Sequence, residues 1–487
     1  MKEKSLKLNA TLNVIKTIMS LIFPLITFPY ASRILSADGI GKVNFANSII
    51  SYFGIIASLG ISTYAIRESA KVRENKTLLS KFVIEISIIN LVSTVVSYLL
   101  FFVALFLVPK FRDYKVLLII CSTTILLSTL GISWLYSALE EYMYITIRTI
   151  LFQFFSIILL FLFVKTKDDY IKYAAIGVFS NVGSNVLNLI HARKYITFKN
   201  IPKLNIKVHI KPILILFGST IAVSIFTILD TSMLGFISTE IEVGYYSAAS
   251  KIIRMIRDLF PAVFTVLFAR LSIYKNENEV DKINNLISKT FKFIFCFSIP
   301  MAVGLYILMP DIVQIMCGND FKPAIISARI MTPLLILSSC SGFLGGQVML
   351  SLGMDKTYLI CMICSAFLDV VLNLVFIPNY HAAGASFATL LTEFVIFIAY
   401  IVILHKRLNG LKLKKEIFIY LVSAIVMGIT VFLITNLIKT IILRLITAVF
   451  SGISVYALLL FLLRSDFFIQ TCSSLINKRT PTTHTEV

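Results

Sequence analysis

Long apolar runs separated by short polar stretches make up most of the chain. A bilayer core about 30 Å thick needs roughly 20 apolar residues per helical crossing, and it offers no water to bare backbone groups. The runs therefore predict membrane-spanning helices, about fourteen of them by length. Their approximate bounds are 12–34, 43–64, 82–108, 116–136, 145–164, 171–190, 213–237, 245–268, 291–309, 324–352, 358–376, 382–404, 417–437 and 442–463.

The composition indicates the same class of protein. Hydrophobic residues make up 58% of the 487 residues, charged residues only 14%, and the mean hydropathy is +0.90. Soluble domains contain about 25% charged residues. We therefore predict an all-α polytopic membrane protein. No cleavable signal peptide is expected, because the first apolar run is long and contains Lys16.

The formal net charge is +20, and the positions of the basic residues indicate the membrane topology. With a cytoplasmic N-terminus, about 29 of the 45 lysines and arginines fall in cytoplasmic segments and about 10 in external ones, as the positive-inside rule requires. The densest cytoplasmic stretches are 67–81, 193–211, 270–292 and 406–415. No soluble segment exceeds about 25 residues, which excludes a nucleic-acid-binding domain. Both termini are expected in the cytoplasm.

Weak internal matches indicate two similar halves. Gly41 and Gly244 precede similar segments at the start of the second and eighth predicted helices, about 203 residues apart. We predict an N-terminal lobe of six helices at 1–192, a basic cytoplasmic linker at 193–212, a C-terminal lobe of six helices at 213–405, two further helices at 406–464 and a cytoplasmic tail at 465–487. Two such lobes enclose a central cavity that can open to either side of the membrane.

Charged side chains inside the predicted helices are the first candidates for a functional site, since each costs about 2.5–3.5 kcal/mol at mid-bilayer. On the eighth helix Lys251, Arg254 and Asp258 are spaced i, i+3 and i+7 and share a face, with Arg257 beside Arg254. Asp230 of the seventh helix is expected at the depth of Lys251, and a salt bridge between them is one interpretation. Because two acids cannot neutralise three cations, we expect surplus positive charge facing a wet interior.

Three more cations are candidates for the same cavity. Lys16 stands near the predicted cytoplasmic end of the first helix, where its side chain can also snorkel to the surface. Arg33 follows Pro24 and Pro29, which are expected to kink or break this helix and free carbonyls toward the cavity. Arg329 lies near the external end of the tenth helix.

The second half contains buried acids. Asp369, with Asn373 one turn later, and Glu393 either bind a coupling cation or hold helices together, and both interpretations stay open. Glu85 and Arg148 lie near predicted cytoplasmic helix ends and are expected to be interfacial.

Metal and redox chemistry find no support in the sequence. Cys361 and Cys364 form a C-x-x-C inside an apolar run, where cysteine usually serves as a small hydrophobic residue. The five histidines lack the spacing of metal ligands. We expect no cofactor, while a coupling ion, H+ or Na+, stays open.

Excess arginine and lysine in a cavity suits phosphate, because guanidinium binds its oxygens in a bidentate fork and stays charged. A pump for cationic drugs requires the opposite sign. Polar side chains of the second, sixth and seventh helices can bind sugar hydroxyls, or equally hold helices together. They are Asn44, Asn47, Ser48, Ser51, Asn181, Ser184, Asn185, Asn188, Ser219 and Thr220.

Several segments carry a family resemblance. The first runs from Pro24 to Leu35 (PLITFPYASRIL) and continues from Gly39 as GIGKVNFA. Others begin at Trp134 (WLY), at Asp230 (DTSMLG) and at Gly318 (GNDFKPA). Together they resemble the oligosaccharide flippases in the polysaccharide-transport branch of the multidrug/oligosaccharidyl-lipid/polysaccharide exporter superfamily.

The resemblance implies two six-helix lobes plus two C-terminal helices. It also implies export of undecaprenyl-pyrophosphate-linked oligosaccharide units to the outer leaflet of the bacterial cytoplasmic membrane, for O-antigen or capsule assembly. By this resemblance Arg33, Lys251, Arg254 and Arg257 engage the pyrophosphate or acidic sugars. Membrane lipids and polysaccharide polymerase machinery are the implied partners.

Three other functions are alternatives to an oligosaccharide flippase. A cation-coupled drug or metabolite exporter and a peptidoglycan-precursor lipid flippase share the expected architecture, and only the cargo separates them from an oligosaccharide flippase. A membrane glycosyltransferase or polysaccharide polymerase usually needs a sizeable external loop, whereas the longest predicted external connection has about 14 residues. We therefore expect a transporter and not an enzyme.

Overall fold

The computed structural model describes residues 6–199, 201–277, 279–405 and 413–477, with the backbone alone for some stretches such as 6–18. These residues form helices and contain no strand. The predicted apolar segments fall on these helices, so the all-α prediction is confirmed. Within the described ranges, 7 helices are long and apolar enough to cross a membrane, or 8 if one bent pair is a single span. Leu6–Ser58 (α1) and Asp355–Ile403 (α16) each hold two predicted segments, so a total of fourteen spans stays a prediction.

The chain forms two compact units. Unit 1 contains Met1–Ser247, Met316–Phe321 and Asn373–Ala385; unit 2 contains Ala248–Ile315, Lys322–Leu372 and Ser386–Val487. This division differs from the predicted lobes because α10, which opens the predicted second half, packs against α1 within unit 1. The lobe boundaries stay a prediction.

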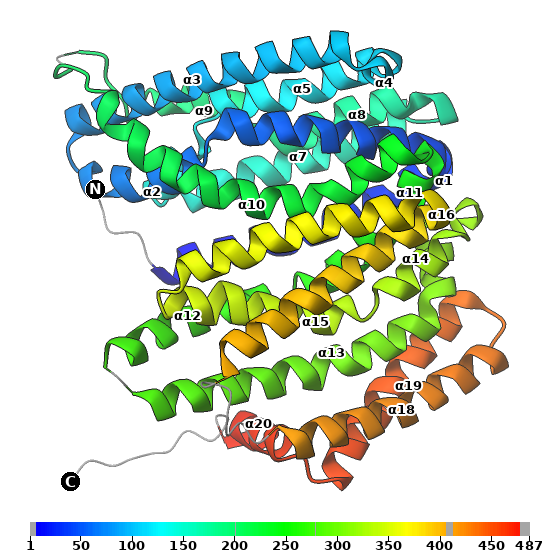
Figure 1. Ribbon diagram of the computed structural model, residues 1–487. Helices are drawn as coiled ribbons and strands as arrows, with labels where there is room; N and C mark the ends of the chain where they lie inside the picture. The colour runs from blue at the N-terminus through cyan, green and yellow to red at the C-terminus, as the bar shows by residue number, and fades with distance from the viewer. Residues whose placement is uncertain (1–5, 200, 278, 406–412, 478–487) are drawn as a thin grey trace. The chain divides into compact units, whose positions relative to one another are not determined.

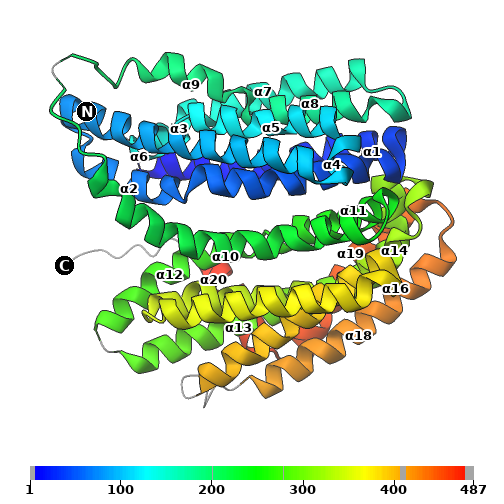
Figure 2. The ribbon, with the colours of Figure 1, turned by 45° about the horizontal axis from the view of Figure 1, so that its top comes forward.

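Unit 1 is built around α1, which packs against α3, α5, α7 and α10. Figures 1 and 2 show α3 and α5 side by side in this unit. Its elements are α1, α2 (Ile61–Val72), α3 (Lys76–Leu107), α4 (Pro109–Asp113), α5 (Lys115–Leu130), α6 (Ser133–Ala138), α7 (Tyr142–Phe163), the 3-10 turn η1 (Lys167–Asp169), α8 (Tyr170–Val178), the π-helical turn η2 (Phe179–Gly183), α9 (Asn185–Ala192), α10 (Lys207–Ile237), the first part of α11 (Glu240–Arg257), the 3-10 turn η3 (Asn319–Phe321) and the Asn373–Ala385 part of α16.

The interruption of α1 lies at Ser36. This residue has φ 56° and ψ −176°, whereas the helix continues through Pro24 and Pro29. The helix is therefore not broken at the prolines, and a kink there stays a prediction. A proline removes one helical hydrogen bond, which neighbouring helices in a bundle can compensate, but a left-handed residue ends the helical path outright.

Two glycines let α1 and α11 meet backbone to backbone just after this break. A Cβ atom on Gly41 would collide with the carbonyl oxygen of Glu240, and one on Gly244 would collide with that of Ala37. Gly41 and Gly244 are 203 residues apart, and so are Ala37 and Glu240. The contact is thus reciprocal, which supports the repeat proposed from the sequence.

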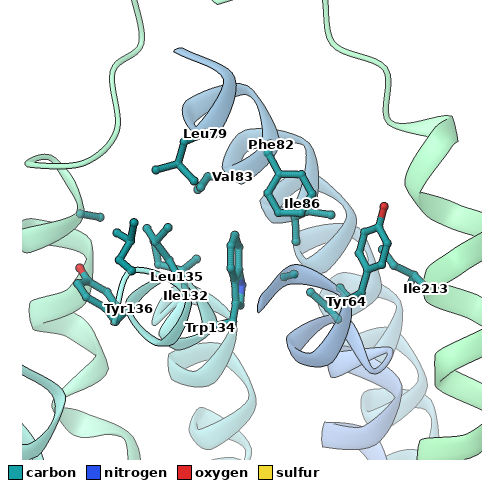
Figure 3. Packing of buried hydrophobic residues seen from close by; sticks show 14 of the residues in the cluster. Tyr64, Leu79, Phe82, Val83, Ile86, Ile132, Trp134, Leu135, Tyr136 and Ile213 are labelled. Atoms are coloured by element: carbon teal, nitrogen blue, oxygen red, sulfur yellow. The ribbon is translucent and has the colours of Figure 1, made fainter. Parts of the chain in front are cut away.

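A compact apolar cluster joins α2, α3 and α6 at one end of unit 1. Trp134 of α6 packs edge-on against Phe82 of α3, with ring centroids 6.0 Å apart. Figure 3 shows the Trp134 ring between Ile132 and Leu135 on one side and Phe82 and Ile86 on the other. Leu135 and Tyr136 are fully buried beside it. The cluster holds these helices together at the end of unit 1 that the sequence predicts to be cytoplasmic.

Unit 2 contains the remaining helices. They are the rest of α11, α12 (Pro261–Asn276), α13 (Val280–Cys317), α14 (Ala324–Met331), α15 (Leu334–Phe343), the π-helical turn η4 (Leu344–Met349), the rest of α16, α18 (Lys414–Leu437), α19 (Ile441–Leu462) and α20 (Asp466–Asn477). The two predicted C-terminal helices are confirmed as α18 and α19, which pack together (Figure 1). Arg444 of α19 ties this pair to α13 through a bidentate ion pair with Asp311.

Candidate functional site

The cations of α11 lie on a polar face of an otherwise apolar helix. Ser247, Ser250, Lys251 and Arg254 recur at helical spacing and are at least partly exposed, whereas residues such as Ile252 on the opposite side are buried. Such a face is costly against lipid, so it must meet water or polar groups. The predicted grouping of Lys251 with Arg254 therefore agrees with the structure.

Asp258 does not share this face. α11 ends at Arg257 and α12 begins at Pro261, so the single predicted helix 245–268 is wrong. Proline has no N–H to continue a helix but suits a first position. Asp258, in the turn between them, accepts two hydrogen bonds of 3.3 Å from its neighbour Arg257. With a half-exposed aspartate side chain, this pair contributes little stability.

Asp230 is buried in unit 1 and receives two hydrogen bonds. The Tyr246 hydroxyl of α11 donates to Oδ2 at 2.5 Å, and the Asn373 amide of α16 donates to Oδ1 at 2.7 Å. The hydroxyls of Tyr52 of α1 and Ser232 of α10 form another polar contact, at 2.7 Å. Because Asp230, Tyr246 and Asn373 come from three helices, the carboxylate links α10, α11 and α16.

The other two predicted acids, Asp369 and Glu393, belong to α16 and lie in unit 2. Asp369 is fully buried and accepts a 3.1 Å hydrogen bond from Thr392. The adjacent Glu393 accepts a 2.7 Å hydrogen bond from Ser341 of α15, and Arg257 lies near enough to act on it electrostatically. The described residues contain no group of three or more His, Cys, Asp or Glu suited to a metal ion.

The remaining predicted cations have separate surroundings. Arg33 is exposed, and its Cγ lies 3.2 Å from where a Cβ on Gly318 would stand. Arg329 donates a 3.1 Å hydrogen bond to the Tyr306 carbonyl and lies 5.0 Å from the centroid of that ring, so it fastens α14 to α13. The side chain of Lys16 falls outside the described residues, as do those of Ser219 and Thr220.

Glu85 of α3 was expected at the membrane interface from its place near a helix end. In the structure its side chain is buried among neighbouring segments. It binds the segment that joins the two predicted halves: its Oε1 accepts a hydrogen bond from the Asn205 amide, and its Oε2 lies 3.0 Å from His209 Nε2. The other ring nitrogen of His209 lies 2.8 Å from the Tyr64 hydroxyl. Nothing in the local spacing reveals this network, because Glu85 and His209 are 124 residues apart.

The Glu85→Gln variant is expected to loosen this segment. The backbone N–H of Asn205 loses its charged acceptor, and a hydrogen bond to a charged group is worth about 1.5–3 kcal/mol of stability. Trypsin should then cut the basic stretch 193–211 faster than in the wild type, as followed by gel electrophoresis of protein in detergent. Glu68→Gln is the matched control, since Glu68 forms only exposed ion pairs with Arg67 and Lys71. Equal cleavage of the Glu85 variant and this control would show that Glu85 does not hold the segment.

A family model decides the relationship of the chain to known proteins. The model described as polysaccharide biosynthesis protein matches residues 6–275, more than half of the sequence. The chain belongs to this family. A protein of Escherichia coli (strain K12) named as an O-antigen transporter is 26% identical over 385 residues, 77% of this chain and 91% of that protein.

Solved structures of other transport proteins share the fold of this chain. Lipid II flippase MurJ in an inward closed conformation matches 96% of this chain and 99% of its own, with 18% identity and a TM-score of 0.72. An inward-facing multidrug resistance MATE family transporter of the MOP superfamily matches 82% of this chain and 99% of its own, with 14% identity and a TM-score of 0.59. The predicted MATE-like fold class is confirmed.

Proposed function

We propose that the protein is a flippase that moves undecaprenyl-pyrophosphate-linked oligosaccharide units from the cytoplasmic to the outer leaflet of the bacterial cytoplasmic membrane, for O-antigen or capsule assembly. The observation that carries the proposal is the polar face of α11, on which Lys251 and Arg254 lie among serines. Guanidinium and ammonium groups suit a diphosphate, and the serines suit sugar hydroxyls. The family and the name of the E. coli relative support the same cargo class.

The mechanism that suits this fold is alternating access. The diphosphate and sugars enter beside the cations while the polyprenyl chain stays in the bilayer, and a rocking motion of the two halves exposes the head group outside. No covalent step is required of the protein. Both termini lie in the cytoplasm in this proposal, and the flipped unit becomes available to polymerase machinery on the outer side.

Three acids on the helices supply places for a coupling cation. Asp230, Asp369 and Glu393 each accept hydrogen bonds from neutral side chains, so a proton or Na+ at these carboxylates changes the local charge. One elementary charge moved across the membrane is worth about 2.3 kcal/mol per 100 mV. Imposed H+ and Na+ gradients, tested separately in proteoliposomes, identify which ion accelerates transport.

The proposal is tested with a labelled lipid-linked oligosaccharide placed in the inner leaflet of proteoliposomes. The protein should make the sugar accessible to a glycosidase added outside, and empty liposomes should not. A drug exporter of the same fold would instead transport cationic drugs and leave the lipid unmoved, an outcome that would refute the proposed cargo.

A further inference from the structure

Arg148 of α7 is a buried cation that no acid in the described part of the chain neutralises. Its side chain faces the interior of unit 1, with the residue 6% exposed. Its Nη1 donates a 3.2 Å hydrogen bond to the Ser184 carbonyl, and its Cζ lies 5.7 Å from the centroid of Tyr144. The tyrosines that interact with it electrostatically are Tyr144 and Tyr136, whose hydroxyls are neutral and do not balance its charge. Buried charges are normally paired or coordinated, because removing them from water is costly.

One edge of the Arg148 guanidinium has no hydrogen-bond partner among the described residues. Nε is buried without a hydrogen-bond partner, and Nη2 donates none to the described residues. The Nε and Nη2 hydrogens point in parallel along this edge, in the fork that matches two oxygens of a carboxylate or phosphate. The edge is thus shaped for an oxyanion.

Further polar atoms without partners lie on the elements around Arg148. The ring of His191 stacks on Tyr144, with centroids 4.1 Å apart, and its Nδ1 is buried without a partner. The Ser180 hydroxyl, in the π-helical turn η2 one turn before Ser184, is also buried without a partner. Single π-helical turns inside α-helices recur at functional sites. His191 and Tyr144 are partly exposed, so this group lies directly beneath the surface of unit 1.

We infer that Arg148 is the centre of a binding site for a phosphate-type oxyanion, either inorganic phosphate or the phosphate of a lipid head group, at the predicted cytoplasmic end of unit 1. The fork selects a ligand with two oxygens over a spherical ion. The site does not depend on the identity of the transported cargo.

The test measures the unfolding temperature of the full-length protein in detergent against inorganic phosphate at constant ionic strength. Binding to the folded state alone raises Tm with the logarithm of phosphate concentration. Arg148→Lys keeps a positive charge but loses the fork, and should weaken phosphate binding by about tenfold or more. Arg67→Lys, a change of the same kind at an exposed ion pair, should keep the wild-type shift.

A second arm separates the two sources of phosphate. Native mass spectrometry of protein extracted from vesicles containing phosphatidic acid should show one retained lipid in the wild type, and loss of that lipid in Arg148→Lys, if the ligand is a head group. A Tm shift with inorganic phosphate and no retained lipid identifies a free anion. Failure of both probes with the wild type, or equal responses of wild type and Arg148→Lys, would show that Arg148 is merely hydrated and overturn the inference.

Discussion

Joint replacement of Lys251 and Arg254 by alanine is expected to lower the rate of lipid-linked oligosaccharide transport about 100-fold. Each side chain offers one charge-assisted contact to the cargo diphosphate, and losing one such contact costs about tenfold or more. The two cations share the polar face of α11 with serines, so the same change removes the positive charge of that face. The rate is measured in proteoliposomes as external glycosidase accessibility of the labelled sugar.

The control removes two positive charges elsewhere in unit 2. Arg270 and Lys289 are exposed and lie in a predicted cytoplasmic stretch, so their joint replacement by alanine should leave the rate within about twofold of the wild type. Wild-type transport by the Lys251 and Arg254 variant, with normal yield and unfolding temperature, would remove these residues from the cargo site.

The Gly41→Ala variant is expected to be less stable than the wild type by about 1–3 kcal/mol, the usual cost of overpacking. Its new methyl group would overlap the carbonyl oxygen of Glu240, which is backbone and cannot rotate away. Gly244→Ala should behave in the same way, because its methyl group would meet the carbonyl of Ala37. If this crossing must form and separate during transport, both variants also lose transport. Thermal unfolding and the transport rate are measured on the same preparations.

Gly54→Ala is the matched control for the glycine contact. Gly54 lies on the same helix, and nothing stands within 4 Å of an added Cβ. Alanine there should be neutral or stabilise the helix by up to about 1 kcal/mol. Unfolding temperatures of Gly41→Ala and Gly54→Ala that coincide would mean that α1 and α11 do not meet at this point.

Apolar run length predicted the helices well, because a bilayer leaves the backbone no alternative to helical hydrogen bonding. It did not locate the interruptions. The prolines of α1 were the obvious candidates, yet the break lies at Ser36, whose left-handed backbone has no sequence signature. By contrast, Pro261 could have indicated the end of α11, because it is the first residue of α12.

The sequence predicted the candidate site only for residues whose grouping follows from their spacing on one helix. Lys251 and Arg254 share a face because they are three residues apart, and the structure retains that face. Glu85 and Arg148 are buried between helices, which the sequence did not predict, since depth along a helix does not tell which side meets its neighbours. Asp230 has partners 16 and 143 residues away, a pairing that only the packed helices reveal.

The most direct test of the account compares two lipids in the same proteoliposomes, with identical polyprenyl chains and identical sugars, joined by a diphosphate in one and by a neutral linker in the other. Recognition through cations predicts that the diphosphate lipid is flipped at least tenfold faster, and that this preference disappears in the Lys251 and Arg254 variant. Equal rates for the two lipids with the wild type would contradict phosphate recognition by α11.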